Sequence, residues 1–154
     1  MSWVVSRSEF YVETRGFCDM KNISGEVQTA VDQAGLKEGL ASIFVPGSTA
    51  GLTAIEYEGG ALQDLKEAIE RMAPEGLPYK HDARWGDGNG FAHVRAALMG
   101  PALAVPVVAG KLSLGTWQQV LLVDFDNRSR KRKVMVTLMG NGEVDDTVPG
   151  GKRL

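Results

Sequence analysis

Two histidines and three neighbouring acidic and amide side chains form the clearest chemical group in this sequence. His81 and His93 are its only histidines, and Asp82, Asp87 and Asn89 lie between them. Imidazole and carboxylate groups together can hold a divalent cation or move protons near neutral pH. The spacing matches no strong metal signature, such as His-x-x-x-His, Cys-x-x-Cys or a calcium-binding loop. The residues leave two interpretations open, a cation or acid–base site and a set of turn-forming, solvated side chains.

Residues 86–90 are rich in glycine and precede an expected helix, an arrangement that suits an anion. Glycine lets backbone amides approach a ligand closely, and a helix N-terminus favours negative charge. Arg84 and Arg95 bracket this segment and could add charge-assisted hydrogen bonds to a phosphate or carboxylate. Surface ion pairs are the alternative for both arginines. The segment is neither a P-loop nor a dinucleotide-binding turn.

A second loop of small residues, 47–51, lies between two apolar runs and carries Ser48 and Thr49. Their hydroxyl and amide groups could bind the same anion, or could bond only to the local backbone. Glu56 lies in an otherwise apolar strand pattern, where an inward-facing carboxylate would be paired or would suit a general base. An outward-facing Glu56 would be solvated. Trp117 offers a flat stacking surface, with a place in the core as the alternative.

Composition excludes several classes of protein. The net charge of −2 argues against a nucleic-acid partner held by bulk electrostatics, and the basic run 128–133 favours a turn with a solvated edge strand. The single cysteine, Cys18, excludes an intrachain disulfide and is interpreted as a small buried residue. No leader pattern and no apolar run of about 20 residues is present. We therefore expect a cytoplasmic protein without a nucleic-acid or membrane partner.

Strands and helices that position these side chains follow from the apolar periodicity. A helix is expected between an N-cap at Ser24 and a C-terminal glycine at Gly35, with further helices over 61–73 and 91–99. The third helix is expected to bury Val94, Ala97 and Leu98. Expected strands cover 6–14, 17–23 (in a hairpin with the first), 39–45, 52–57, 103–108, 111–114, 116–124 and 133–138. A loop is expected over 75–90 and a frayed polar tail over 141–154.

The element order predicts an α+β fold, a single-domain, mostly antiparallel β-sandwich with two to three helices and a core over about residues 9–138. Three segments, FVPGSTAGLTAIEYE, DGNGFAHVRAALMGP and LSLGTWQQVLLVDFD, resemble the YjbQ-like family, some members of which are described as secondary thiamine-phosphate synthases. The resemblance implies a homotrimer with sites near subunit contacts. It also implies the joining of a pyrimidine diphosphate to a thiazole phosphate with release of pyrophosphate.

The resemblance marks these positions: Ser48, Thr49, Glu56, Asp87, Asn89, His93, Arg95, Trp117 and Gln118. Many members carry histidines where this chain has Gly47 and Phe91, which leaves His93, with His81 upstream, as metal candidates. We predict a phosphate-binding protein with His93, Arg95 and Glu56 as catalytic residues and Mg²⁺ or another divalent cation as cofactor. The substrate would be a small phosphorylated metabolite, bound by Ser48, Thr49, Arg84, Asp87, Asn89, Trp117 and Gln118. A non-catalytic metabolite-binding or structural trimer is the alternative.

Overall fold

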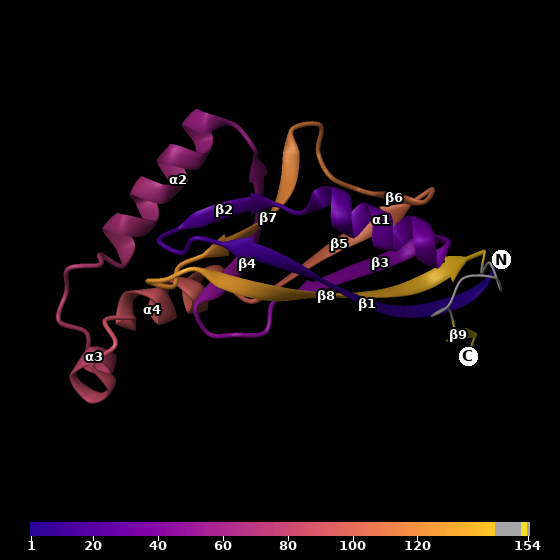
Figure 1. The fold of residues 1–154 in the computed structure, drawn as a ribbon. Coiled ribbons are helices and arrows are strands. Elements are labelled where there is room, and N and C mark those ends of the chain that lie inside the picture. The colour runs from indigo at the N-terminus through magenta and orange to yellow at the C-terminus, as the bar shows by residue number, and fades with distance from the viewer. Residues whose placement is uncertain (144–151, 154) are drawn as a thin grey trace.

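Two antiparallel sheets and four helices make up the described part of the chain (Figure 1). The structure, a computed structural model, describes residues 1–143 and the backbone of Lys152 and Arg153. The helices are α1 (Ser24–Ala34), α2 (Gly59–Met72), α3 (Lys80–Trp85) and α4 (Gly90–Met99). The strands are β1 (Ser2–Thr14), β2 (Asp19–Asn22), β3 (Leu36–Phe44), β4 (Ala50–Glu56), β5 (Ala102–Val108), β6 (Lys111–Leu112), β7 (Gln118–Asp124), β8 (Arg130–Gly142) and β9 (Lys152–Arg153).

The larger sheet has the order β6-β5-β3-β8-β1-β9, and the smaller has the order β2-β7-β4. The 13-residue strands β1 and β8 pair over their full length, from Ser2 opposite Gly142 to Thr14 opposite Arg130. These two strands run from the N-terminal side of the molecule towards α4 in Figure 1, and α2, α3 and α4 gather at the end away from the N-terminus. Among the described residues, no helix is long and apolar enough to cross a membrane.

Strand β7 is buried on both faces because it separates two apolar clusters. Val120 and Leu122 face the first cluster, which also contains buried residues of α1, β3, β4, β5 and β8. Leu121 and Val123 face the second cluster, together with Phe91 and other residues of α4. The small sheet therefore lies between the large sheet and the helices α2 and α4. This arrangement confirms the predicted α+β sandwich and the three predicted helices, and adds a fourth helix, α3.

Several local predictions were wrong. Strand β2 pairs with β7 and not with β1, so residues 1–23 do not form a hairpin. The expected loop over 75–90 contains α3. Ser24 does not cap α1 through its side chain, because its hydroxyl accepts a hydrogen bond from the Val120 amide at 2.7 Å. Gly35 ends α1 with φ of 67°, as predicted.

The third predicted helix is present as α4, but its buried face was assigned wrongly. Val94 is 40 % exposed and Leu98 60 % exposed, whereas Phe91, Arg95 and Ala96 are buried. The apolar stripe chosen from the sequence was displaced by about one residue, which turns a helix by roughly 100°. The prediction was wrong because Arg95 lies on the buried face, whereas charged residues normally lie on the solvent-exposed face of a helix.

The basic run leading into β8 lies in a different environment from the one predicted. Strand β8 lies between β3 and β1, so it is an interior strand of the large sheet. Arg132 is only 9 % exposed. The tail prediction was wrong for Asn141 and Gly142, which continue β8, and its remainder from residue 144 lies outside the described residues apart from β9.

Candidate functional site

A histidine–aspartate cluster is formed by His81 and Asp82 of α3, Asp87 of the following loop and His93 of α4. The Nδ1 atom of His81 lies 3.2 Å from Asp87 Oδ1 and 3.6 Å from Asp82 Oδ1. The ring centroids of His81 and His93 are 4.3 Å apart. One candidate ligand atom from each of His81, Asp82 and Asp87 lies within 4.8 Å of the other two. The fold thus brings both histidines together with two carboxylates.

Backbone contacts at the start of α4 hold this cluster in place. Asp82 Oδ1 accepts a hydrogen bond from the Gly90 amide at 2.8 Å, which satisfies a free N–H at the helix N-terminus. Asp87 Oδ1 accepts one from the Asn89 amide at 3.2 Å. A Cβ atom at Gly90 would overlap the side chain of Tyr79, so only glycine permits this close approach of α4 to α3.

The cluster has the donor chemistry of a divalent-cation site. His81 Nδ1 is shielded from solvent and has no hydrogen-bond partner, although two carboxylate oxygens face it. Imidazole nitrogen and carboxylate oxygen are common ligands for divalent transition metals and zinc. The side chains of Asp82 and Asp87 are 26 % and 46 % exposed, so the cluster opens to solvent. These residues fit a cation, with His93 as the neighbouring imidazole.

A buried charged network lies at the ends of β7 and β8. Arg132 holds Asp124 in a bidentate pair, with Nε–Oδ2 at 2.7 Å and Nη2–Oδ1 at 2.9 Å. Thr14 Oγ1 donates to Asp124 Oδ2 at 2.6 Å. Thr49 Oγ1 accepts from Arg132 Nη2 at 2.6 Å and donates to Asp126 Oδ2 at 2.9 Å. Both carboxylates are fully buried, so the network joins the two sheets through charge-assisted hydrogen bonds.

Asp126 is held in its ionised form by this network. Burial by itself would raise the pKa of Asp126. Hydrogen bonds from Thr49, Arg130 and Asn89, together with the Arg130 charge, outweigh burial and hold that pKa below its usual range. The Arg130 guanidinium donates to Asp126 Oδ2 from Nε at 3.0 Å.

The loops 47–51 and 86–90, predicted to share a pocket, both reach the turn between β7 and β8. The first reaches it through Thr49 and Asp126. The second reaches it through Asn127, whose amide donates to Asn89 Oδ1 at 3.0 Å and whose Nδ2 donates to the Asp87 carbonyl at 2.7 Å. A fully buried carboxylate lies at this junction and would repel an anion bound beside it, and the anion pocket between the loops stays a prediction.

Comparison with known proteins places the chain in a family. The model of the "UPF0047 protein YjbQ-like" family matches residues 8–141. The chain belongs to the YjbQ-like family. A UPF0047 protein of Archaeoglobus fulgidus is 38 % identical over 128 residues, covering 83 % of this chain and 97 % of that protein. The UPF0047 protein YugU of Bacillus subtilis is 34 % identical over 123 residues, covering 79 % and 90 %.

Solved structures of YjbQ-like proteins share the fold. A YbjQ-like protein of unknown function from Sulfolobus solfataricus superposes with a TM-score of 0.85 at 32 % identity, covering 90 % of this chain and 99 % of that one. An uncharacterised YjbQ/UPF0047 protein from Clostridium acetobutylicum gives a TM-score of 0.78 at 34 % identity, covering 85 % and 98 %.

Arg95, a predicted catalytic residue, is committed to structural contacts. Its side chain is 3 % exposed, its Nε donates to the Ala73 carbonyl at 2.9 Å, and it forms an ion pair with Glu70. Its guanidinium also lies over the Phe91 ring, 5.0 Å from the centroid. Arg95 therefore ties α4 to the end of α2, whereas the sequence suggested that it faces a phosphate.

Glu56, Trp117 and Gln118 lie far from the histidine–aspartate cluster. Glu56 pairs with Gln118 at one end of β4 and β7, and the other end of that ladder pairs Ala50 with Asp124. Six residues of strand separate the two ends, about 20 Å at roughly 3.3 Å per residue. Glu56 is exposed, and Trp117 is 73 % exposed, so it is outside the core. Within one subunit these three residues cannot act together with His93.

Of the remaining predicted residues, Ser48 is exposed in the loop before β4, and Arg84 is exposed with its guanidinium 5.4 Å from the ring centroid of Trp85. Cys18 is 5 % exposed, as predicted, and burial raises the pKa of its thiol. Neither Ser48 nor Arg84 forms a hydrogen bond or ion pair with the cluster in the described part of the chain, so their predicted binding roles rest on the sequence.

Three residues of the buried network were missed in the sequence, namely Asp124, Asp126 and Arg132. Signals were present for all of them. Asp124 and Asp126 end a run of apolar strand residues, and Arg132 alternates with the apolar Val134 in the following strand. A charged residue at a strand position that faces the core needs a partner of opposite charge or a hydrogen bond, so its position in the alternating pattern indicates an ion pair.

Proposed function

We propose that this YjbQ-like protein binds a divalent cation at His81, Asp82 and Asp87, with His93 beside them, and uses it to recognise a phosphate-bearing metabolite. The observation that carries the proposal is His81 Nδ1, a shielded nitrogen with no hydrogen bond that faces two carboxylate oxygens at 3.2 and 3.6 Å. Metal ligation satisfies such a nitrogen and screens the adjacent carboxylates from each other.

The exposed side of the cluster suits a ligand that reaches the cation from solvent. A bound cation would supply Lewis-acid stabilisation of negative charge on a phosphate. His93 is half-buried and lies next to His81, so its imidazole is close to a ligand bound at the cluster. The Asn89 side chain fixes the loop that carries Asp87 by accepting from Asn127. These residues bind and orient the ligand.

The reaction to test first is the joining of a pyrimidine diphosphate to a thiazole phosphate with release of pyrophosphate, because the sequence resembles a family in which that activity is described. The second candidate is a non-catalytic metabolite-binding protein. Two observations favour it: Arg95 is engaged by Glu70 and the Ala73 carbonyl, and Glu56 lies at the far end of the small sheet. The residues predicted to share catalysis are dispersed in a single subunit.

Self-association as a homotrimer is proposed together with this function. The outward face of the large sheet carries Phe44 opposite Met135, with Met139 four residues further along β8, opposite Leu40. These side chains are 41 %, 38 % and 38 % exposed. An apolar sheet face of this kind favours a contact with another protein surface, and a second copy could also bring the Glu56 end of one subunit near the cluster of another.

The test is titration of metal-free protein with Mn²⁺ and Zn²⁺ by calorimetry, followed by an assay with both thiamine precursors and Mg²⁺. Wild-type protein is compared with His81→Ala and Asp87→Asn, and Asp64→Asn on the exposed side of α2 is the matched control. We expect the two cluster variants to weaken cation affinity about 10- to 100-fold and the control to bind normally. Equal binding by all variants contradicts the cation site. Normal cation binding with no product favours the non-catalytic alternative.

A further inference from the structure

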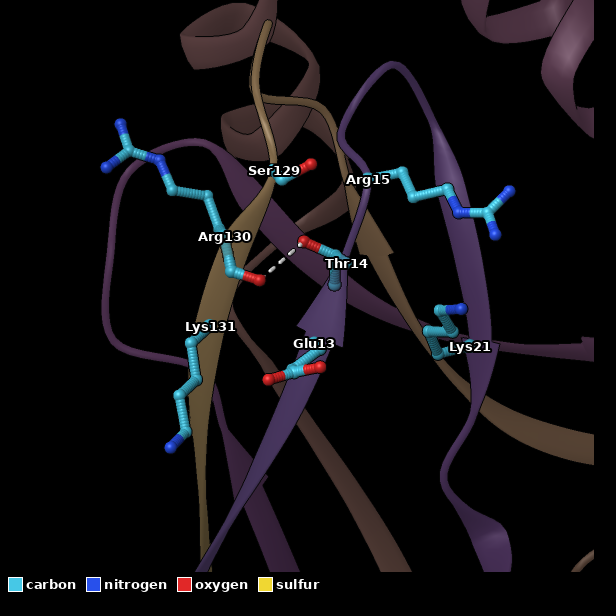
Figure 2. Close-up of a pocket in the computed structure, with 7 residues that line it drawn as sticks. All are labelled: Glu13, Thr14, Arg15, Lys21, Ser129, Arg130 and Lys131. Carbon is cyan, nitrogen blue, oxygen red and sulfur yellow. Dashed lines mark hydrogen bonds between the residues drawn. The ribbon is translucent and has the colours of Figure 1, made fainter.

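A cationic hollow lies where β1 ends and β8 begins, and no residue of the histidine–aspartate cluster lines it. Its volume is about 520 Å³, within the range of small-ligand pockets. Figure 2 shows the residues that surround it: Glu13, Thr14, Arg15, Lys21, Ser129, Arg130 and Lys131. They come from three strands and their adjoining loops. Segments far apart in the sequence therefore contribute to one surface.

The lining is strongly basic for a protein of net charge −2. Four of its side chains are cationic, and Glu13 is its single carboxylate. Arg130 is partly neutralised, since its Nη2 lies 3.0 Å from Asp126 Oδ2, and Lys21 lies 3.6 Å from Asp19. Arg15 has no carboxylate within 4.0 Å in the described part of the chain.

Lys131, like Arg15, has no carboxylate within 4.0 Å among residues 1–143. Its Nζ lies 5.1 Å from the ring centroid of Tyr11. Figure 2 shows Arg15 and Lys21 on one side of the hollow and Lys131 on the other. Two cations without carboxylate partners and a third that is weakly paired thus line one hollow. Figure 2 shows the Arg15 and Lys131 side chains extending away from each other, so these long, flexible side chains would have to turn inward to contact one anion.

The walls of the hollow are fixed by backbone contacts. Thr14 is opposite Arg130 in the ladder, and its Oγ1, whose proton is donated to Asp124, lies 3.3 Å from the Arg130 carbonyl oxygen. The Arg15 amide donates to Asp19 Oδ2 at 2.8 Å, and the Phe17 amide donates to the Asp126 carbonyl at 2.8 Å. The backbone that carries the cations is therefore preorganised, and only side chains need to order around a ligand.

We propose that this hollow binds a compact, multiply charged anion of the phosphate class, such as pyrophosphate or the phosphate group of an ester. A nucleic acid fits the surface less well, because its backbone needs a continuous cationic track. On β1, Glu9 and Glu13 are exposed on the same face as Tyr11 and interrupt such a track. The inference is independent of the cation proposed at His81.

The experiment is calorimetric titration of the full chain with inorganic pyrophosphate in EDTA, which keeps any cation out of the measurement. Removing two cations in the double variant Arg15→Gln/Lys21→Gln should weaken binding by about 100-fold, since each charge-assisted contact is worth about a factor of ten. Glu13→Gln should strengthen binding about threefold by removing the one repulsive carboxylate. A loss of folding could not produce this gain.

The matched control is Arg7→Gln, an exposed arginine on β1 that does not line the hollow, and it should bind pyrophosphate as the wild type does. His81→Ala should also bind normally in EDTA, which separates this site from the cation cluster. The proposal is overturned if wild-type protein does not bind pyrophosphate, if Arg7→Gln weakens binding as much as the double variant, or if Glu13→Gln has no effect. Tighter binding of a single-stranded RNA through the same residues also overturns it.

Discussion

Replacing Arg132 by methionine tests whether the buried charged network holds the two sheets together. Arg132 is 9 % exposed and forms two hydrogen bonds to Asp124 and one to Thr49. Methionine keeps much of the side-chain volume and removes the charge. Asp124, which is fully buried, would then keep one described side-chain donor, Thr14. The variant therefore isolates the cost of leaving a buried carboxylate without its cation.

The expected magnitude follows from the geometry. Removing one partner of a buried ion pair costs about 3–5 kcal/mol of unfolding free energy, because the remaining charge stays desolvated. For a domain of about 150 residues, each kcal/mol lowers Tm by about 2–4 °C, so Arg132→Met should lower Tm by about 6–20 °C. The double variant Asp124→Asn/Arg132→Met removes both charges. It should recover a large part of the loss, since neutral replacements of buried pairs are often tolerated.

The assay is urea unfolding followed by circular dichroism, with the midpoint and the slope m measured for each variant. Arg7→Met, on the exposed face of β1, is the surface control and should change stability by less than about 0.5 kcal/mol. A loss below about 1 kcal/mol for Arg132→Met with an unchanged m would refute the reasoning. So would a double variant no more stable than the single one, because its loss would then come from packing and not from the unpaired charge.

Three further changes have expected outcomes. Thr49→Val removes a hydroxyl with two buried polar partners and should cost about 1–3 kcal/mol in urea unfolding, whereas Ser48→Ala next to it should be neutral. The pKa of Asp126 is lowered on folding, so the stabilisation that its carboxylate gives is present above the unfolded value of about 3.9 and is lost as pH falls through the folded pKa. The Tm of Asp126→Asn should therefore fall less steeply than that of the wild type below about pH 4. An equally steep fall would exclude Asp126 as the source of the acid sensitivity. Met135→Lys on the open sheet face should reduce the mass measured by light scattering if that face is a subunit contact, and a mass equal to that of the wild type would exclude this face as the contact.

The relation between sequence and structure is clearest in α4. Its existence, its glycine-rich start and its end near Gly100 could be predicted from local residue types, because helix periodicity and termination act over a few residues. The buried face of α4 could not be predicted from local residue types. That face is set by Glu70 and the Ala73 carbonyl, which give Arg95 partners beneath α2, and these partners lie more than 20 residues away in the sequence.

Strand pairing shows the same limit. The alternation of β1 and β2 was visible in the sequence, but short local patterns do not say which strand a segment will pair with, and β2 joins β7 about 100 residues later. The prediction of a solvated edge strand for the basic run 128–133 was wrong for a related reason. Its charges suggested an exposed edge, whereas Asp124 and Asp126, brought from the end of β7, neutralise Arg132 and Arg130 inside the fold.

The sequence by itself determined the family, the α+β class, the three longer helices and most strands, because these depend on residue patterns that repeat over short distances. It also pointed to His81, His93 and Asp87 as one chemical group. Only the tertiary structure decided which groups meet. It joined α3 to α4 through Asp82 and Gly90, separated Glu56 and Gln118 from them by the length of β4, and gathered Arg15, Lys21 and Lys131 around one hollow. The physical reason is that charge pairing and burial act between segments distant in the chain, and their geometry exists only after the sheets have packed.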